Sequence, residues 1–287
     1  MLLTMTSCFS VVFTTDAPHQ YWKIIPHDNL SGDLWANGVL GTAIDGDASE
    51  SGSLVSDNPK AGMIEEPGLY RMTLDMSMRT YTVKKLVFND FLYEIGGESG
   101  WTDYHKLRKK SKDDVMNDGR YQGYYYLTSE FRFTPSDDNS DDAYGCIGAG
   151  KISDNGGSDC PAPDADFYQI DVDLVRGTYA LTAVQSITMV GDHNGWNQKD
   201  ANCHMIYNAT ENCWEIEQTF EGTASLKFAM NDDWTVSWGG ANEDPLNYEN
   251  LTQNNGANLA VPGAGTYLVK LYLSCEGGNR VTFTQRQ

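Results

Sequence analysis

The chain has 287 residues, and 20 Lys and Arg stand against 40 Asp and Glu, which gives a formal net charge of −20. A surface this acidic repels phosphate backbones and anionic lipid headgroups, which excludes nucleic-acid and membrane-surface binding as main functions. The 28 Gly predict a turn-rich fold, and no apolar run approaches the about 18 residues that a transmembrane helix needs.

The first eight residues, MLLTMTSC, allow two interpretations. Small residues before Cys8 are typical of a bacterial lipoprotein cleavage site, but the basic start is missing and the apolar core is shorter than about 7–15 residues. Alternatively the chain starts late, inside a strand of a longer protein. Residues 8–25 align with residues 213–229, and the strand that precedes the latter has no counterpart before Cys8. We favour the late start.

Three similar units follow one another along the chain. Each closes with a strand in which apolar residues alternate with others, beginning at Tyr70, Tyr168 and Tyr267, about 100 residues apart. Pro-containing segments precede these strands, and a turn and a second strand follow. We therefore predict an all-β protein of tandem Ig-like antiparallel β-sandwich modules, with a partial module at 1–86 and full modules at 87–185 and 186–287.

The second and third units also share their opening. LYEIGGESGW, which ends at Trp101, is similar to ITMVGDHNGW, which ends at Trp196, and the later strand EFRF is similar to SLKF. Between these features, residues 106–116 are highly charged and predict at most a short turn, because too few are apolar to pack as a helix.

Motifs of catalysis and metal binding are missing from the sequence. There is no HExxH, GxSxG, P-loop or CxxC, and the five His are scattered. The acidic segments at 45–47 and 137–142 do not have EF-hand spacing. Three sandwich units also leave no room for a catalytic domain. We therefore expect a non-enzymatic protein without cofactor or metal.

Tryptophan residues stand among turn residues in the third unit. Trp196 follows a Gly-flanked polar turn, and Trp234 follows Asn and Asp. Such side chains either fold back as apolar lids or remain exposed for a ligand, and two in one unit favour a ligand. An indole can cover the C–H face of a pyranose ring, which removes roughly 100 Å² from water and contributes about 2.5 kcal/mol.

These motifs resemble the carbohydrate-binding modules of the SusE/SusF outer-membrane proteins of Bacteroidetes starch-utilisation systems. The resemblance rests on (I/L)xxxGxxxGW, a later (L/F)(K/R)F strand and a Pro-Gly-x-Tyr closing strand, and it covers essentially the whole chain. It implies non-catalytic surface lipoproteins that hold α-glucan on an aromatic pair. It also implies an outer-membrane location beside a transport channel and a partner binding lipoprotein.

In the third unit, the resemblance implies a platform of Trp196 and Trp234. Lys227 would donate to sugar hydroxyls, and Asn254 or Asn255 would supply an amide. The alternative for Lys227 is a solvent-facing strand residue without a role in binding.

The second unit departs from this pattern. Trp101 and Arg132 occupy the first two positions, but Asn139 stands where the second Trp is expected, and Tyr144 could replace it if its loop folds over. Arg132 keeps the hydrogen-bond donor of a Lys but changes its shape. The first unit has Lys23 and Trp35 without an opening Trp, so we expect it to bind weakly or not at all.

The sequence thus predicts a protein that captures starch or another α-glucan at the cell surface without cleaving it. Three alternatives stay open: another polysaccharide, a structural or adhesive spacer whose Trp residues pack inward, and a fragment of a glycoside hydrolase. The cysteines also stay open, because Cys146 with Cys160, or Cys203 with Cys213, could form disulfides, while free buried thiols fit equally well.

Overall fold

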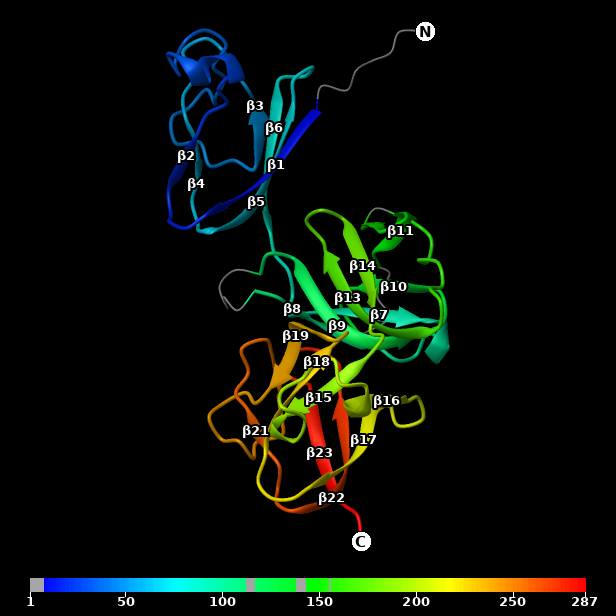
Figure 1. Ribbon diagram of the computed structural model, residues 1–287. Coiled ribbons are helices and arrows are strands. Elements are labelled where there is room, and N and C mark those ends of the chain that lie inside the picture. Colours follow the sequence, from blue (N-terminus) through cyan, green and yellow to red (C-terminus); the bar gives the residue numbers. More distant parts are fainter. Residues whose placement is uncertain (1–7, 112–116, 138–142, 155) are drawn as a thin grey trace. The chain divides into compact units, whose positions relative to one another are not determined.

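The computed structural model describes residues 8–111, 117–137, 143–154 and 156–287 (Figure 1). The chain divides into two compact units, residues 1–88 with 113–118, and residues 89–112 with 119–287. From here on, the first and second units are these two, and the second contains both the second and the third sequence repeats. Within the described residues, the regular elements are antiparallel strands and four short 3-10 helices, which confirms the predicted all-β sandwich class. No helix in this part of the chain is long and apolar enough to cross a membrane.

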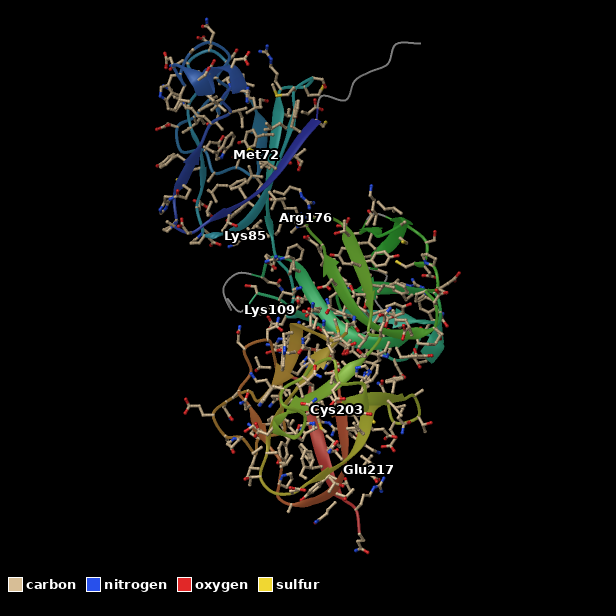
Figure 2. The ribbon with its side chains drawn as sticks, in the orientation of Figure 1. Met72, Lys85, Lys109, Arg176, Cys203 and Glu217 are labelled. Carbon is tan, nitrogen blue, oxygen red and sulfur yellow. The ribbon has the colours of Figure 1, made fainter. Side chains whose placement is uncertain are left out.

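The first unit contains a four-stranded sheet in the order β1-β5-β6-β3 and a two-stranded sheet of β2 and β4. Its elements are β1 (Cys8–Thr15), β2 (Gln20–Trp22), η1 (His27–Ser31), β3 (Ser51–Ser53), β4 (Gly62–Ile64), β5 (Gly68–Asp75) and β6 (Thr80–Leu86). Alternate residues of β5 face inward as predicted, and Met72, labelled in Figure 2, joins Tyr70, Tyr81 and Leu54 in the core. This unit therefore has a hydrophobic core of its own.

The second unit begins with an eight-stranded sheet in the order β10-β7-β8-β9-β13-β14-β12-β11. Its elements are β7 (Phe91–Gly96), η2 (Gly97–Ser99), β8 (His105–Lys109), β9 (Arg120–Leu127), β10 (Phe131–Thr134), β11 (Gly145–Gly148), β12 (Lys151–Ser153), β13 (Asp166–Asp173) and β14 (Thr178–Ala183). We call this sheet and its loops the second module. Strand β8 lies where the sequence predicted only a short turn. Its charged residues tolerate a strand because Leu107 fills the core and buried Lys109 pairs with Asp90 at 2.9 Å (Figure 2).

The remaining residues of the second unit form a nine-stranded sheet in the order β20-β19-β18-β15-β16-β17-β22-β23, with β21 also paired to β18. Its elements are β15 (Ile187–Gly191), η3 (Asp192–Asn194), η4 (Ala201–Cys203), β16 (His204–Asn208), β17 (Cys213–Phe220), β18 (Ser225–Met230), β19 (Asp233–Gly239), β20 (Thr252–Gln253), β21 (Leu259–Ala260), β22 (Gly265–Tyr272) and β23 (Arg280–Gln285). We call this sheet and its loops the third module. In the first unit, β1, β5 and β6 pair in the same order as β17, β22 and β23 do here.

Aromatic side chains join the second and third modules into one core. Tyr124 of β9 packs edge-on against Trp238 at 5.1 Å between ring centroids, and Phe167 of β13 packs edge-on against Trp214 at 5.7 Å. All four side chains are buried. The connection from β14 to β15 is correspondingly short, because β14 ends at Ala183 and β15 begins at Ile187.

The six cysteines all lie in the described part of the chain, and all are free thiols. Cys8 is exposed, whereas Cys146, Cys160, Cys203, Cys213 and Cys275 are buried. Burial raises the pKa of the Cys203 thiol to about 11, which keeps it protonated near neutral pH.

Candidate functional site

Two indoles that are distant in sequence meet at one edge of the third module. Trp196 follows η3, and Trp234 lies near the start of β19. Their ring centroids are 6.5 Å apart and their planes are inclined by 33°. Trp234 is 38% exposed and Trp196 is half-buried, so both rings reach solvent. The structure therefore brings together the two residues predicted to form the platform.

The conformation of Trp196 is set by a tight turn after β15. Gly195 and Trp196 both adopt left-handed backbone angles, with φ of 63° and 60°, and the Trp196 amide donates to the Gly191 carbonyl at 2.9 Å. The second module has the same turn, since Gly100 and Trp101 both have φ of 64° and the Trp101 amide donates to the Gly96 carbonyl. The shared Gly-rich motif thus specifies one local geometry that directs a Trp outward.

Asp192 fixes the indole of Trp196 to the sheet. Its Oδ1 accepts a hydrogen bond from Trp196 Nε1 at 3.0 Å, and its Oδ2 accepts one from the Ser225 backbone amide at 2.8 Å. These two bonds, the one from Ser225 being the stronger influence, lower the pKa of Asp192 below its ordinary value. Sequence analysis missed this residue, although an acidic residue four positions before a turn Trp is a usable signal.

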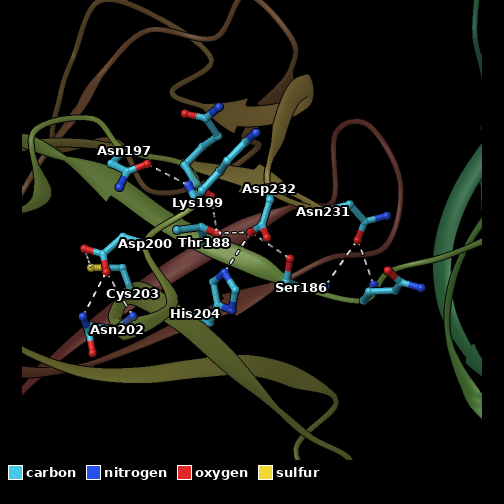
Figure 3. A network of polar contacts seen from close by, with 12 residues as sticks. Ser186, Thr188, Asn197, Lys199, Asp200, Asn202, Cys203, His204, Asn231 and Asp232 are labelled. Atoms are coloured by element: carbon cyan, nitrogen blue, oxygen red, sulfur yellow. Dashed lines mark hydrogen bonds and ion pairs between the residues drawn. The ribbon is translucent and has the colours of Figure 1, made fainter.

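Trp234 is positioned by the hairpin between β18 and β19. The two turn residues, Asn231 and Asp232, have φ of 53° and 57°, which is the type I′ geometry that Asn and Asp tolerate. Figure 3 shows that Asp232 is held from the neighbouring strands, with its Oδ1 2.8 Å from His204 Nε2 and within hydrogen-bond distance of the Ser186 and Thr188 hydroxyls. The turn is therefore rigid on the side where Trp234 emerges.

Lys227 lies on the side of β18 that faces away from the core. Leu226 and Phe228, its neighbours in the strand, are fully buried, whereas Lys227 is half-buried. Its register partner is Val190 of β15, so the two side chains share one face of the sheet. Thr188 of β15 lies on the same face, and its Oγ1 donates to the carbonyl of Gln198 in the loop that follows Trp196. Within the described residues, Lys227 has no ion pair and no hydrogen bond, so its ammonium group is available to a ligand.

The two predicted amides follow β20 in a left-handed turn, with φ of 52° for Asn254 and 54° for Asn255. Asn254 pairs with Ser237 of β19 through its backbone amide at 2.7 Å and its side-chain oxygen at 3.1 Å. This leaves the side-chain NH₂ of Asn254 as a free donor, and Asn255 is exposed. Asn254 is thus held against Ser237 of β19, the strand that also carries Trp234.

The second module presents a different arrangement around its turn Trp. The guanidinium of Arg132 stacks on Trp101 at 4.8 Å from the ring centroid and forms an ion pair with Asp159 at 3.1 Å. Tyr144 pairs through its backbone with Phe133, so it lies on the face of β10 opposite to that of Arg132. Asn139 lies outside the described residues.

The first unit carries an exposed aromatic site that the sequence analysis expected to be weak. Trp35 is 63% exposed, and Lys23 Nζ lies 5.3 Å from its ring centroid and donates to the Pro59 carbonyl at 2.7 Å. These side chains line a pocket of about 450 Å³ together with Asn37, Ser56 and Asn58. An indole, a cation and amides around a hollow are the groups that recognise a sugar. The sequence signal was Trp35 itself, which stands in a polar turn-rich segment.

Comparisons with known proteins found a similar module and a similar fold. Residues 4–85 match the family model described as SusF, first starch-specific CBM. The crystal structure of SusF from Bacteroides thetaiotaomicron is similar to 95% of this chain, with a TM-score of 0.50 and 18% sequence identity, and the chain covers 66% of that protein. A search of curated proteins gave no match. The first unit thus matches the SusF module model, the fold of most of the chain is similar to that of SusF, and the resemblance to SusE/SusF-type proteins is confirmed.

Proposed function

We propose that the chain is a non-catalytic glycan-binding protein that captures starch or maltooligosaccharides on aromatic platforms. The observation that carries this proposal is the Trp196–Trp234 pair, which is solvent-facing and fixed from below by polar contacts. A spacer protein has no need to expose two indoles side by side, because each would bury more apolar area by packing inward. The match of residues 4–85 to a starch-specific module supports the same conclusion.

The inclination of the two rings favours a curved glycan over a flat one. Two successive sugar rings of an α-1,4-glucan are rotated and bent with respect to each other, whereas those of a β-1,4-glucan follow a straight ribbon. Indoles inclined by 33° at 6.5 Å offer faces of different orientation to neighbouring rings. Lys227 lies on β18, and Asn254 follows β20 and is hydrogen-bonded to Ser237 of β19, so both would bind the hydroxyls at the edge of the sugar.

The decisive experiment is titration calorimetry of the chain with maltoheptaose and, as a flat competitor of similar length, a cello-oligosaccharide. We expect a Kd between about 1 μM and 1 mM for the α-glucan and a weaker one for the competitor. Trp196→Ala and Trp234→Ala should each reduce affinity at least about tenfold, since each removes one ring face. Ile206→Ala, which truncates an exposed apolar residue of the same module, is the matched control.

Four outcomes would contradict parts of this proposal. Tight binding of a different polysaccharide would keep the platform and change its ligand. Absence of binding to any glycan, or loss of thermal stability in both Trp variants, would favour the spacer role. Hydrolysis of a chromogenic glycoside by the purified chain would show an enzyme.

The surface location and the partners extend the same proposal. Because the chain resembles SusE/SusF-type proteins, we propose that it works at the outer membrane beside a transport channel and a partner binding lipoprotein, and passes glycan to them for uptake. Labelling of intact cells with an antibody to the chain would test the location, and co-purification after crosslinking would test the partners.

A further inference from the structure

Two carboxylates and an imidazole meet beneath the surface of the second module. Glu94 of β7 and His105 of β8 are register partners, so their side chains share the inner face of the sheet. His105 Nδ1 lies 2.6 Å from Glu94 Oε2, and Glu98 of η2 completes the cluster. One nitrogen or oxygen atom from each of the three residues lies within 4.8 Å of the other two.

The oxygens of this cluster lack the partners that buried polar atoms normally have. The Glu94 side chain has no solvent exposure, and its Oε1 has no hydrogen-bond partner among the described residues. Both oxygens of Glu98 are also buried, and neither accepts a hydrogen bond from another described residue. Native proteins leave very few such atoms unsatisfied, so three of them directed at one place indicate a missing ligand.

The third module shows that the fold does not require carboxylates at the positions of Glu94 and Glu98. Counted from the shared turn, Met189 stands two residues before Gly191 as Glu94 stands before Gly96, and His193 corresponds in the same way to Glu98. Met189 is fully buried, and His193 Nε2 lies 3.1 Å from its carbonyl oxygen. Because buried ionic groups are seldom more stable than apolar ones of similar volume, the carboxylates of the second module require another reason.

Glu98 folds back against the end of β7. A Cβ atom at Gly96 would come within 2.6 Å of Glu98 Oε2 and 2.9 Å of the Glu130 carbonyl oxygen, so glycine accommodates both. His105 is fixed by stacking on Tyr125, with the ring centroids 4.3 Å apart and the planes inclined by 7°. An imidazole held in this way keeps its Nδ1 directed at the carboxylates.

We propose that Glu94, Glu98 and His105 form a binding site for a divalent transition-metal ion. Two carboxylates neutralise a charge of +2, and a neutral imidazole supplies the nitrogen donor, so the buried site would carry no net charge. A site with an imidazole ligand is unfavourable for Mg²⁺ and Ca²⁺, because these ions prefer oxygen ligands. Zn²⁺ binds imidazole nitrogen and carboxylate oxygen, and three protein ligands can leave its fourth position open to water. Zn²⁺ is therefore the expected occupant.

The ion would act on the turn that carries Trp101. Glu98 belongs to η2, three residues before Trp101, whereas Glu94 and His105 belong to paired strands. A metal bond between them would fix the turn to the sheet. In the third module, the hydrogen bonds of Asp192 fix the corresponding turn without an ion. This inference concerns stability and local order, and it does not depend on the glycan that the protein binds.

The test uses the full chain after removal of metal with a chelator and gel filtration. Titration with ZnCl₂ should show one site per chain with a raised melting temperature, and Co²⁺ should give the visible absorption of a low-coordinate nitrogen and oxygen site. Glu98→Gln should weaken Zn²⁺ binding at least about tenfold, because one anionic ligand is lost. Glu94→Met, which installs the residue of the third module, should abolish binding.

Two control variants separate this site from weak surface binding. His27→Ala removes a solvent-exposed His that lies 3.8 Å from Asp28, and Cys8→Ser removes the exposed thiol, and both should leave the Zn²⁺ affinity unchanged. If Glu94→Met fails to fold, Glu98→Gln decides, because Glu98 belongs to the short helix η2 and not to a strand of the sheet. Absence of Zn²⁺ and Co²⁺ binding, or equal affinity in Glu98→Gln, would overturn the proposal.

Discussion

The carboxylate of Asp192 orients one of the two indoles of the proposed platform. It accepts one hydrogen bond from the indole of Trp196 and another from the backbone of Ser225 on β18. A Trp in a surface loop would otherwise sample several rotamers, and ordering it on binding would cost part of the interaction energy. Asp192 is thus a positioning residue for the platform.

We predict that Asp192→Asn weakens glycan binding several-fold and lowers the unfolding free energy by about 1 kcal/mol. The Asn side chain has one acceptor oxygen, so it cannot serve both the indole and the Ser225 amide, and each such bond contributes about 1 kcal/mol. Calorimetry with maltoheptaose measures the affinity, and a thermal melt measures the stability. Asp244→Asn is the control, since Asp244 stabilises only a local turn in an exposed loop.

The pH dependence follows from the same contacts. The pKa of Asp192 lies below its ordinary 3.8 in the folded protein, because the Ser225 amide and the Trp196 indole bind its charged form. Its contribution is therefore complete above pH 3.8 and is lost as pH falls through the lowered pKa. Glycan affinity should be constant from pH 7 to about pH 4 and decline below it in the wild type, and less so in Asp192→Asn. A decline already at pH 6 would contradict this assignment.

At the scale of elements, the turn between β18 and β19 both orients Trp234 and holds the segment between β14 and β15. Asn231 accepts hydrogen bonds from the Gln185 and Ser186 amides at 2.8 and 3.2 Å and donates to the Ala183 carbonyl at 3.0 Å. The turn that orients Trp234 therefore also holds the segment between β14 and β15. A change in this turn should affect both stability and binding.

We predict that Asn231→Gly costs about 1–3 kcal/mol of unfolding free energy and that Asn231→Ala costs about 1 kcal/mol more. Both variants lose the side-chain hydrogen bonds, but only glycine adopts the φ of 53° without strain. Urea unfolding of the two variants isolates the backbone term by difference. Equal stability of Gly and Ala variants would show that the turn relaxes to another geometry.

The sequence was informative about these elements to different degrees. The closing strands at Tyr70, Tyr168 and Tyr267 were predictable because one face is buried and the alternation is visible, and the turn before Trp196 was predictable from its glycines. Strand β8 was missed because four of its five residues are charged or His, and Leu107 is the single apolar residue that could indicate a buried face. Asp232 and His204 could not be paired in advance, since they lie 28 positions apart and meet only through the sheet register.

At the scale of the whole chain, each module has its own solvent-accessible Trp, whereas the second and third modules share one hydrophobic core. Exposed or half-buried Trp35, Trp101 and Trp196 lie in different modules, so a long glucan could engage more than one of them and gain avidity over an oligosaccharide. In contrast, the second and third modules share the buried contacts of Tyr124 and Phe167.

We predict that these two modules unfold together. Phe167 lies in the second module, but its ring contacts Tyr207 at 5.0 Å and Trp214 at 5.7 Å in the third. Phe167→Ala should cost about 3–5 kcal/mol and lower the melting temperature of residues 89–287 as one transition in calorimetry. Ile206→Ala should leave this transition unchanged. Separate transitions for the two modules, with only the second one shifted, would contradict a shared core.

The spacing of the platform rings also gives the molecule an optical property. Indoles whose centroids are 6.5 Å apart are close enough for their electronic transitions to couple, and the coupling depends on the angle between the rings. A sugar that covers both rings changes the polarity of their surroundings and restricts the motion of the rings. Changes in circular dichroism and intrinsic fluorescence that glycan causes in the wild type, but not in Trp196→Ala, should therefore report occupancy without an added label, although the chain has seven Trp.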